Sequence, residues 1–380
     1  MPSGTTSKPF PTPLSLLRIL SSFAHTLYLF THNDFLTFAL PTLLFALFGA
    51  LSGPILTTNT TPSLLAILSR IPQTLLLIWS NLLIFDISNQ RSPIAVEEDK
   101  INKPHRPIPA GRITCAGADS VLMAAVPAVL ALSCVWGVWQ ETLTLLLFTY
   151  MYNDLCLSDY HWTTRNSLIA IGYALYSSLA LRIMVGSECT LTSKGWVWIG
   201  VVFAIMLFTQ HICDIKDAPG DKLRGRQSAP VVLGDDMVRC SVAIPVMLCS
   251  VLCPAFFSTL GPVSYVLTLS LGSVVALRTL LYRSLDADKL TWKLWALWTT
   301  VIFALPLAAN AQVFDTQVFV NVWTSLQSSL CGGDCASSLN IAAVSSVALI
   351  VEGRRILGGV EVGDAGNQSI PMIVIEGVTV

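Results

Sequence analysis

Long apolar runs follow one another along most of the chain, and short polar, Gly- and Pro-containing segments separate them. About nine of these runs approach or reach the roughly 17 to 25 residues that a helix needs to cross a bilayer. They lie near 35–56, 64–88, 117–137, 142–158, 167–186, 195–213, 238–256, 262–282 and 293–312. The pattern predicts an all-α integral membrane protein, built as a bundle of about nine transmembrane helices.

The runs divide the chain into three predicted parts. Residues 1–34 begin polar and become amphipathic over 13–31, which favours a helix at the membrane interface. Residues 35–312 contain the predicted spans. Residues 313–380 form a Gly-rich tail, in which the apolar run 338–351 is either an extra helix or a segment packed against the bundle.

Composition supports a membrane protein. Of 380 residues, 53% are hydrophobic and only 12% are charged, with a mean hydropathy of +0.66. Soluble domains carry about 25% charged residues, so a soluble fold of this size could not bury so much apolar surface. The net charge of −1 provides no field that attracts nucleic acid. We therefore expect a lipid bilayer as partner and no nucleic acid, with any anion bound by a local patch.

Basic residues favour one side of the predicted bundle. Segments after the second, fourth, sixth and eighth spans are rich in Lys and Arg, whereas 57–61 and 139–141 contain neither. The positive-inside rule places the basic side and the N-terminus in the cytosol. We expect a multi-pass protein of the endoplasmic reticulum. Topology alone would explain these basic residues, but it does not explain the carboxylates among them.

The sequence QHICDIKDAPGDKLRGRQSAP, residues 210–230, follows an apolar run and is called here the second acidic segment. Asp214, Asp217 and Asp221 are offset by 3 and 7, which puts them on one face if the helix continues. Pro219 and Gly220 favour placing Asp221 on the loop beyond. An interfacial charge cluster is the plain alternative, but carboxylates at a membrane edge are costly and indicate function.

A similar stretch, FDISNQRSPIAVEEDKINKPHRPIPAGR at 85–112, ends another apolar run and is called the first acidic segment. By itself it is also compatible with a solvated loop. We expect it on the same side of the membrane as the second acidic segment, forming a polar cap over the bundle. Its candidate residues are Asp86, Asn89, Gln90, Glu98, Asp99, Asn102, Lys103 and Arg106.

Two facing carboxylate clusters, each followed by Lys and Arg, are typical of a diphosphate site. Mg²⁺ binds through one or two carboxylates together with water and substrate phosphates, and it stabilises a diphosphate as a leaving group. Asn153 and Asp154, at the end of the fourth span, either support such a metal site or only end their helix. Trp residues near span ends are expected to be mostly interfacial anchors, with some lining a hydrocarbon pocket: Trp162, Trp196, Trp198, Trp292 and Trp295.

The motifs Asp99-x-x-Asn102-Lys103-Pro104-x-Arg106-Pro107 and Asp214-x-x-Asp217-x-x-x-Asp221 resemble those of the UbiA-type intramembrane prenyltransferase superfamily. The resemblance implies nine helices and Mg²⁺-dependent ionisation of a prenyl diphosphate by a catalytic domain at 35–312. The first acidic segment departs from the family pattern because Gln90 stands where a further acid is expected. With YNDL and HWxxRN downstream, this form is similar to a fungal subgroup that includes sesquiterpene cyclases.

The resemblance implies a membrane-bound terpene cyclase that acts on farnesyl diphosphate. The metal ligands would be Asp86, Asp99, Asp214, Asp217 and Asp221, and the substrate would be held by Asn102, Lys103, Arg106, Asn153, Lys222 and Arg226. Two alternatives remain open at this point. One is a prenyltransferase that delivers the same cation to an aromatic or other acceptor, and the other is a transporter or non-catalytic membrane protein.

Overall fold

The computed structural model describes residues 13–310, and all regular structure in that range is helical. Its sole extended pairing is an isolated bridge between Thr57 and Leu191. The tail at 313–380, with the apolar run 338–351, lies outside the described residues. The expectation of an all-α fold is confirmed for the part that the structure describes.

The helices follow the predicted apolar runs. Eight helical segments between residues 17 and 309 are long and apolar enough to cross a membrane. The predicted span at 142–158 corresponds to α7, which is shorter than these. In chain order the elements are α1 (Pro13–Asp34), η1 (Phe35–Ala39), α2 (Leu40–Leu51), η2 (Gly53–Ile55), α3 (Leu64–Ser69), α4 (Ile71–Gln90), α5 (Pro93–Asn102), α6 (Cys115–Val135), α7 (Trp139–Asn153), α8 (Leu157–Tyr160), α9 (Trp162–Val185), α10 (Ser193–Thr209), α11 (Ile212–Ile215), α12 (Ala218–Arg224), α13 (Ala229–Leu233), α14 (Asp235–Ala255), α15 (Pro262–Leu281), α16 (Leu285–Phe303) and α17 (Leu305–Ala309).

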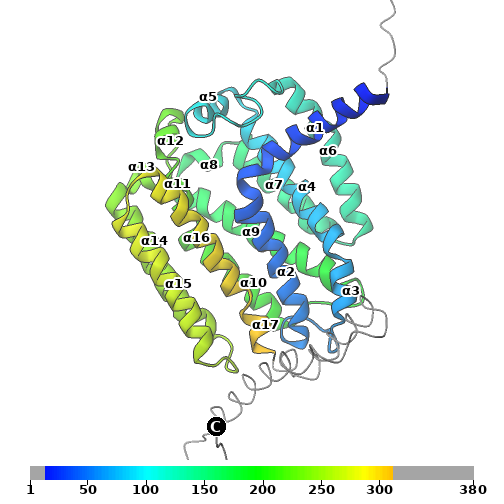
Figure 1. Cartoon of the computed structure of the whole chain (residues 1–380), viewed down its shortest axis with the longest axis vertical. Coiled ribbons are helices and arrows are strands. Elements are labelled where there is room, and N and C mark those ends of the chain that lie inside the picture. The colour runs from blue at the N-terminus through cyan, green and yellow to red at the C-terminus, as the bar shows by residue number, and fades with distance from the viewer. Residues whose placement is uncertain (1–12, 311–380) are drawn as a thin grey trace, which may run out of the picture. The chain divides into compact units, whose positions relative to one another are not determined.

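The first span is longer than the pattern predicts. Helix α1 continues through η1, a single stretch of π-helix, into α2, and the candidate span runs over Leu17–Leu51. Pro41, the second residue of α2, has no N–H, so the α-helical hydrogen-bond ladder is interrupted there. The segment 13–31 and the run 35–56 therefore belong to one continuous helix, which bends between α1 and α2 (Figure 1).

The bundle packs around α9, which contacts α2, α4, α7 and α10. Trp198, Trp295 and Trp298 are fully buried in its core, so Trp198 and Trp295 are not interfacial anchors. Helices α6 and α15 instead bury few of their residues. Their exposed apolar side chains, among them Met123 and Leu277, form a surface suited to contact with lipid.

Five short helices, α5, α8, α11, α12 and α13, gather at one end of the bundle in Figure 1, opposite the end where α3 and α17 lie. The helix of the second acidic segment does not continue as one piece, because α10 ends at Thr209 and two short helices follow. Pro219 lies in the first turn of α12, a position that tolerates a missing N–H. Asp221 therefore lies inside α12, and the expectation that it lies on a loop is wrong.

Candidate active site

A cavity opens beneath these short helices and encloses about 1290 Å³ of space free of atoms, including its opening. Its deeper wall is apolar and aromatic, whereas charged side chains surround its polar end. The aromatic lining residues are Phe38, Phe85, Phe148, Tyr152, Tyr173, Tyr176, Trp292 and Trp295. The charged lining residues are Asp34, Asp86, Glu98, Lys103, Arg106, Arg165, Lys216, Asp217 and Arg226.

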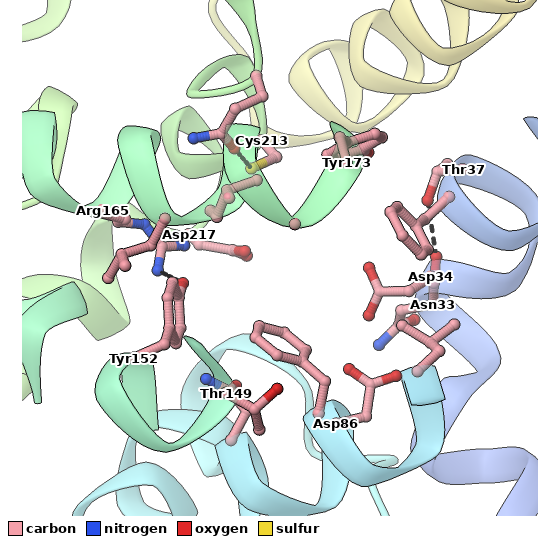
Figure 2. Close-up of a pocket in the computed structure, with 18 of the residues that line it drawn as sticks. Asn33, Asp34, Thr37, Asp86, Thr149, Tyr152, Arg165, Tyr173, Cys213 and Asp217 are labelled. Carbon is pink, nitrogen blue, oxygen red and sulfur yellow. Dashed lines mark hydrogen bonds between the residues drawn. The ribbon is translucent and has the colours of Figure 1, made fainter. Parts of the chain in front are cut away.

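Asp86 lies one turn before the end of α4 and is only 2% exposed. Its Oδ2 atom is buried and has no hydrogen-bond partner among the described residues. Asp34, the last residue of α1, lines the same cavity. Figure 2 shows the carboxyl groups of Asp34 and Asp86 near each other, on a different side of the cavity from Asp217.

Helix α5 carries the other acids of the first acidic segment. Ser92 accepts a hydrogen bond from the N–H of Ala95 and caps the helix, with Pro93 at its first turn. Asp99 is buried, and both its oxygens accept hydrogen bonds from Nη1 of Arg106, at 2.8 and 3.0 Å. Burial raises the pKa of Asp99, although Arg106 opposes that shift.

Asp217 joins the two acidic segments. Its Oδ2 accepts hydrogen bonds from Nζ of Lys103 at 2.9 Å and from Nζ of Lys216 at 2.8 Å. Burial alone would raise the pKa of Asp217, but the two ammonium groups outweigh it and hold the pKa well below its usual range. Asp217 therefore remains ionised in the cavity wall.

The side chain of Asn102, from α5, caps the N-terminus of α12. The side chain of Asp217 caps no N–H of α12. The amide of Asn102 instead accepts from the N–H of Gly220 at 3.3 Å and donates to the Asp217 carbonyl at 2.9 Å. This contact between α5 and α12 leaves the Asp217 carboxylate free to face the lysines.

The remaining predicted acids of the second acidic segment are held by arginines. Arg165 of α9 makes a bidentate contact with Asp214, at 2.8 Å from Nη2 to Oδ1 and 3.1 Å from Nε to Oδ2. Arg226 donates to Asp221 at 2.9 Å. Gly225 has a φ of 78° and ends α12, which turns the chain back so that Arg226 reaches Asp221.

Glu98, which is buried, and Asp159, which is partly exposed, form an ion-pair network with two arginines of the second acidic segment. Arg224 donates to Glu98 at 3.0 Å and to Asp159 at 2.9 Å. Arg226 donates to Glu98 at 3.3 Å and to Asp159 at 2.7 Å. The network fastens α5 to the segment around α12, so the expectation that the two acidic segments face each other at one end of the bundle fits the structure.

The structure brings only part of the predicted set into the cavity wall. The members that line the cavity are Asp86, Lys103, Arg106, Asp217 and Arg226. The members outside its lining are Asp99, Asn102, Asn153, Asp214, Asp221 and Lys222. Asn153 accepts a hydrogen bond from Asn89 at 3.0 Å, and Lys222 is exposed. Burial raises the pKa of Asp221, and the nearby Asp214 carboxylate raises it further.

Sequence reasoning missed three charged lining residues. Asp34 lies alone in a segment assigned to the interface, and no local spacing links it to Asp86. The sequence pattern assigns Arg165 to the basic residues that set topology, and it assigns Lys216 to these residues or to an interfacial charge cluster that compensates the aspartates. Lys216 Nζ lies 4.4 Å from the centre of the Trp292 ring, so Trp292 also belongs to the cavity and not to an interfacial belt. One sequence feature could have indicated that Arg165 belongs to the site. It lies three residues after Trp162, at the start of a helix that faces the acidic motifs.

The residues present fit Mg²⁺ that arrives with a diphosphate. Within residues 13–310, no three His, Cys, Asp or Glu side chains converge closely enough to hold an ion unaided. Mg²⁺ does not require such a cage, because one or two carboxylates plus substrate phosphates and water complete its shell. Asp86 and Asp217 line the cavity, and the buried Oδ2 of Asp86 lacks a hydrogen-bond partner. These two carboxylates are therefore suitable donors.

Two curated fungal proteins are similar to this chain. Diterpene cyclase eriG of Hericium erinaceus is 32% identical over 229 residues, which cover 59% of this chain and 70% of that protein. Fumagillin beta-trans-bergamotene synthase af520 of Aspergillus fumigatus is 30% identical over 233 residues, which cover 60% of this chain and 74% of that protein. The resemblance to fungal terpene cyclases is thereby confirmed.

A solved structure shares the fold. The structure of a UbiA homolog from Archaeoglobus fulgidus bound to GPP and Mg²⁺ superposes with a TM-score of 0.54 at 15% identity. The superposition covers 75% of this chain and 99% of that one. Residues 38–301 of the sequence match the UbiA prenyltransferase family. The chain is a multi-pass membrane protein that belongs to the UbiA prenyltransferase family.

Proposed function

We propose that the protein is a membrane-bound terpene cyclase that ionises farnesyl diphosphate and closes the resulting cation to a cyclic sesquiterpene. The observation that carries this proposal is the cavity itself. Five cationic side chains and four carboxylates line its polar end, and aromatic and aliphatic side chains line the rest. A substrate with an anionic head and a hydrocarbon tail matches that arrangement, whereas a wholly polar or wholly apolar molecule does not.

The basic residues of the cavity hold the diphosphate. Lys103 and Lys216 are already directed to one place by their shared contact with Asp217. Arg226 lines the same end and offers planar N–H donors suited to phosphate oxygens. Asp86 and Asp217 would hold Mg²⁺ there, which when bound neutralises negative charge on the departing diphosphate.

The apolar wall governs the fate of the cation. When the carbon–oxygen bond breaks, the diphosphate leaves with the electron pair and an allylic cation remains. Phe38 packs edge-on against Tyr173 and Tyr176, with ring centres 4.7 and 4.8 Å apart. Such rings attract a cation through their π-faces, and the apolar surroundings exclude water that would quench it. Ring closure and loss of a proton then give a neutral hydrocarbon.

Relatives support the same reaction class without deciding it. The fungal relatives eriG and af520 are named as cyclases, whereas eriF of Hericium erinaceus, 32% identical over 199 residues, is named as a polyprenyl transferase, and the matching family is named for prenyl transfer. A transferase would use the same polar end and would need an acceptor beside the cation. Localisation in the endoplasmic reticulum, with the polar end in the cytosol, is part of the proposal and rests on the distribution of Lys and Arg.

The test is incubation of membranes containing the protein with farnesyl diphosphate and Mg²⁺ in the absence of any acceptor. The proposal predicts a cyclic C15 hydrocarbon, detected by gas chromatography and mass spectrometry. Turnover that begins only after an aromatic acceptor is added would show a prenyltransferase instead. No turnover under either condition would contradict both enzymes and favour a non-catalytic membrane protein or transporter.

A further inference from the structure

Asp34 and Asp86 form a pair of carboxyl groups on one wall of the cavity. Asp34 comes from the end of α1 and Asp86 from the last turns of α4, and both line the cavity. The two carboxyl groups are close enough to interact electrostatically. In Figure 2 their carboxyl groups lie together beside the open space.

This pair differs from every other acid discussed at the site. Glu98, Asp99, Asp214, Asp217 and Asp221 each form an ion pair with Lys or Arg. No Lys or Arg of the described chain forms an ion pair with Asp34 or Asp86, and Asp86 Oδ2 is buried without a hydrogen-bond partner. Two carboxylates this close repel each other, so a cation or a proton must lie between them in the stable state.

The position of Asp34 also explains why Gln90 can stand where a further acid is expected. Gln90 occupies the place in α4 where a further acid is expected, but its side chain is fully buried and does not line the cavity. Its amide donates to the Phe30 carbonyl at 2.9 Å and thereby ties α4 to α1, one helical turn before Asp34. Trp79 strengthens this contact by donating to the Thr31 hydroxyl at 3.0 Å. Helix α1 therefore supplies the carboxylate that α4 lacks.

We propose that Asp34 is a metal ligand and shares one Mg²⁺ with Asp86 when a diphosphate is bound. This inference rests on the proposed function, because the ion completes its shell with diphosphate oxygens. The inference adds a residue of the first helix to the catalytic machinery. That helix lies outside both acidic motifs.

The test measures metal binding without turnover. The full chain in nanodiscs is titrated with Mn²⁺ in the presence of inorganic diphosphate, and free Mn²⁺ is followed by electron paramagnetic resonance. Asp34→Asn and Asp86→Asn should each weaken binding at least about tenfold, the smallest loss usual even for residues that only support a ligand. The double variant should be little worse than either single one, because both remove the same ion. Asp286→Asn, an exposed acid of α16, is the charge-matched control and should bind like the wild type.

Thermal unfolding separates a ligand from a structural residue. Without metal, Asp34→Asn should unfold at the wild-type temperature or above it, because it removes the repulsion with Asp86. It should also lose the stabilisation that Mg²⁺ with diphosphate gives the wild type. A lower unfolding temperature without metal, or wild-type Mn²⁺ affinity while Asp86→Asn binds weakly, would overturn the inference and leave the proposed function intact. Absence of Mn²⁺ binding by the wild type would overturn both.

Discussion

The surroundings of Asp217 strongly favour its charged form. Lys103 comes from the first acidic segment and Lys216 from the second, and both contact the same oxygen. The carboxylate therefore orders two cations that face the substrate, in addition to any metal that it binds. Its place in the cavity wall was predictable from sequence because Asp214 and Asp217 are spaced by one turn at the end of an apolar run.

We predict that Asp217→Asn lowers turnover of farnesyl diphosphate by on the order of a hundredfold or more, because charge stabilisation of the leaving group is lost. Membrane insertion should not change, since acidic residues contribute little to orientation. Turnover is compared at matched protein levels with Asp236→Asn, an exposed acid 80% accessible at the start of α14. Near-normal turnover would remove Asp217 from the site.

Gly172 offers a test of the hydrocarbon end of the cavity. It lies in α9 and lines the cavity, and an added Cβ meets no atom within 4 Å. A larger side chain there would extend from a Cβ that clashes with no neighbour and take up space in the cavity. No sequence pattern distinguishes Gly172 from other glycines in apolar helices. Only the folded structure shows which glycines line the cavity.

We predict that Gly172→Leu lowers kcat/KM for farnesyl diphosphate more than for geranyl diphosphate, which is five carbons shorter. The loss of space for one methylene group corresponds to about 10- to 200-fold discrimination. Gly200→Leu is the matched control, because Gly200 also lies in a helix with open space around its Cβ but does not line the cavity. Equal effects of the two variants would show that the deeper cavity does not hold the chain.

At the scale of elements, the contact between α5 and α12 depends on Asn102 and Gly220. A Cβ on Gly220 would lie 2.2 Å from the Asn102 amide nitrogen, so only glycine permits this approach. Asn102 was predicted to bind substrate, but in this structure it bridges the two helices with both ends of its amide. The motif that contains Asn102 was visible in the sequence. The hydrogen-bond partner of Asn102, Gly220, lies 118 positions away and could not be identified from it.

We predict that Gly220→Ala separates α5 from α12 and destabilises the folded protein by about 1 to 3 kcal/mol, the loss of two hydrogen bonds. Hydrogen exchange of α5 should increase, and turnover should fall because Lys103 no longer reaches the site. Gly200→Ala provides a control in which the new methyl group meets no neighbour. Unchanged protection of α5 in Gly220→Ala would contradict this account of the contact.

The sequence predicts where helices occur better than it predicts where one helix joins the next or breaks. Each predicted span corresponds to a helix because long apolar runs have one stable form in a bilayer. The joining of α1 to α2, and the division of the second acidic segment into α11 and α12, depend on tertiary contacts such as those of Gln90 and Asn102. For the same reason Asp34 could not be assigned to the site from its local sequence.

At the scale of the whole molecule, the proposed orientation puts the polar end of the bundle in the cytosol. We predict that glycosylation tags inserted in 91–116 or 214–235 remain unmodified, because both segments would face away from the lumen. A tag inserted in 57–61, at the opposite end of the predicted topology, should be glycosylated and serves as the positive control. Modification of either basic segment would contradict this orientation.

The central claim is that one cavity both ionises a prenyl diphosphate and closes the cation without an acceptor. The most direct measurement follows purified protein in nanodiscs with farnesyl diphosphate alone and quantifies released diphosphate and cyclic hydrocarbon together. The account predicts equal amounts of the two products with Mg²⁺ and neither product after chelation with EDTA. Diphosphate release that survives chelation, or that yields no cyclic hydrocarbon until an acceptor is added, would contradict it.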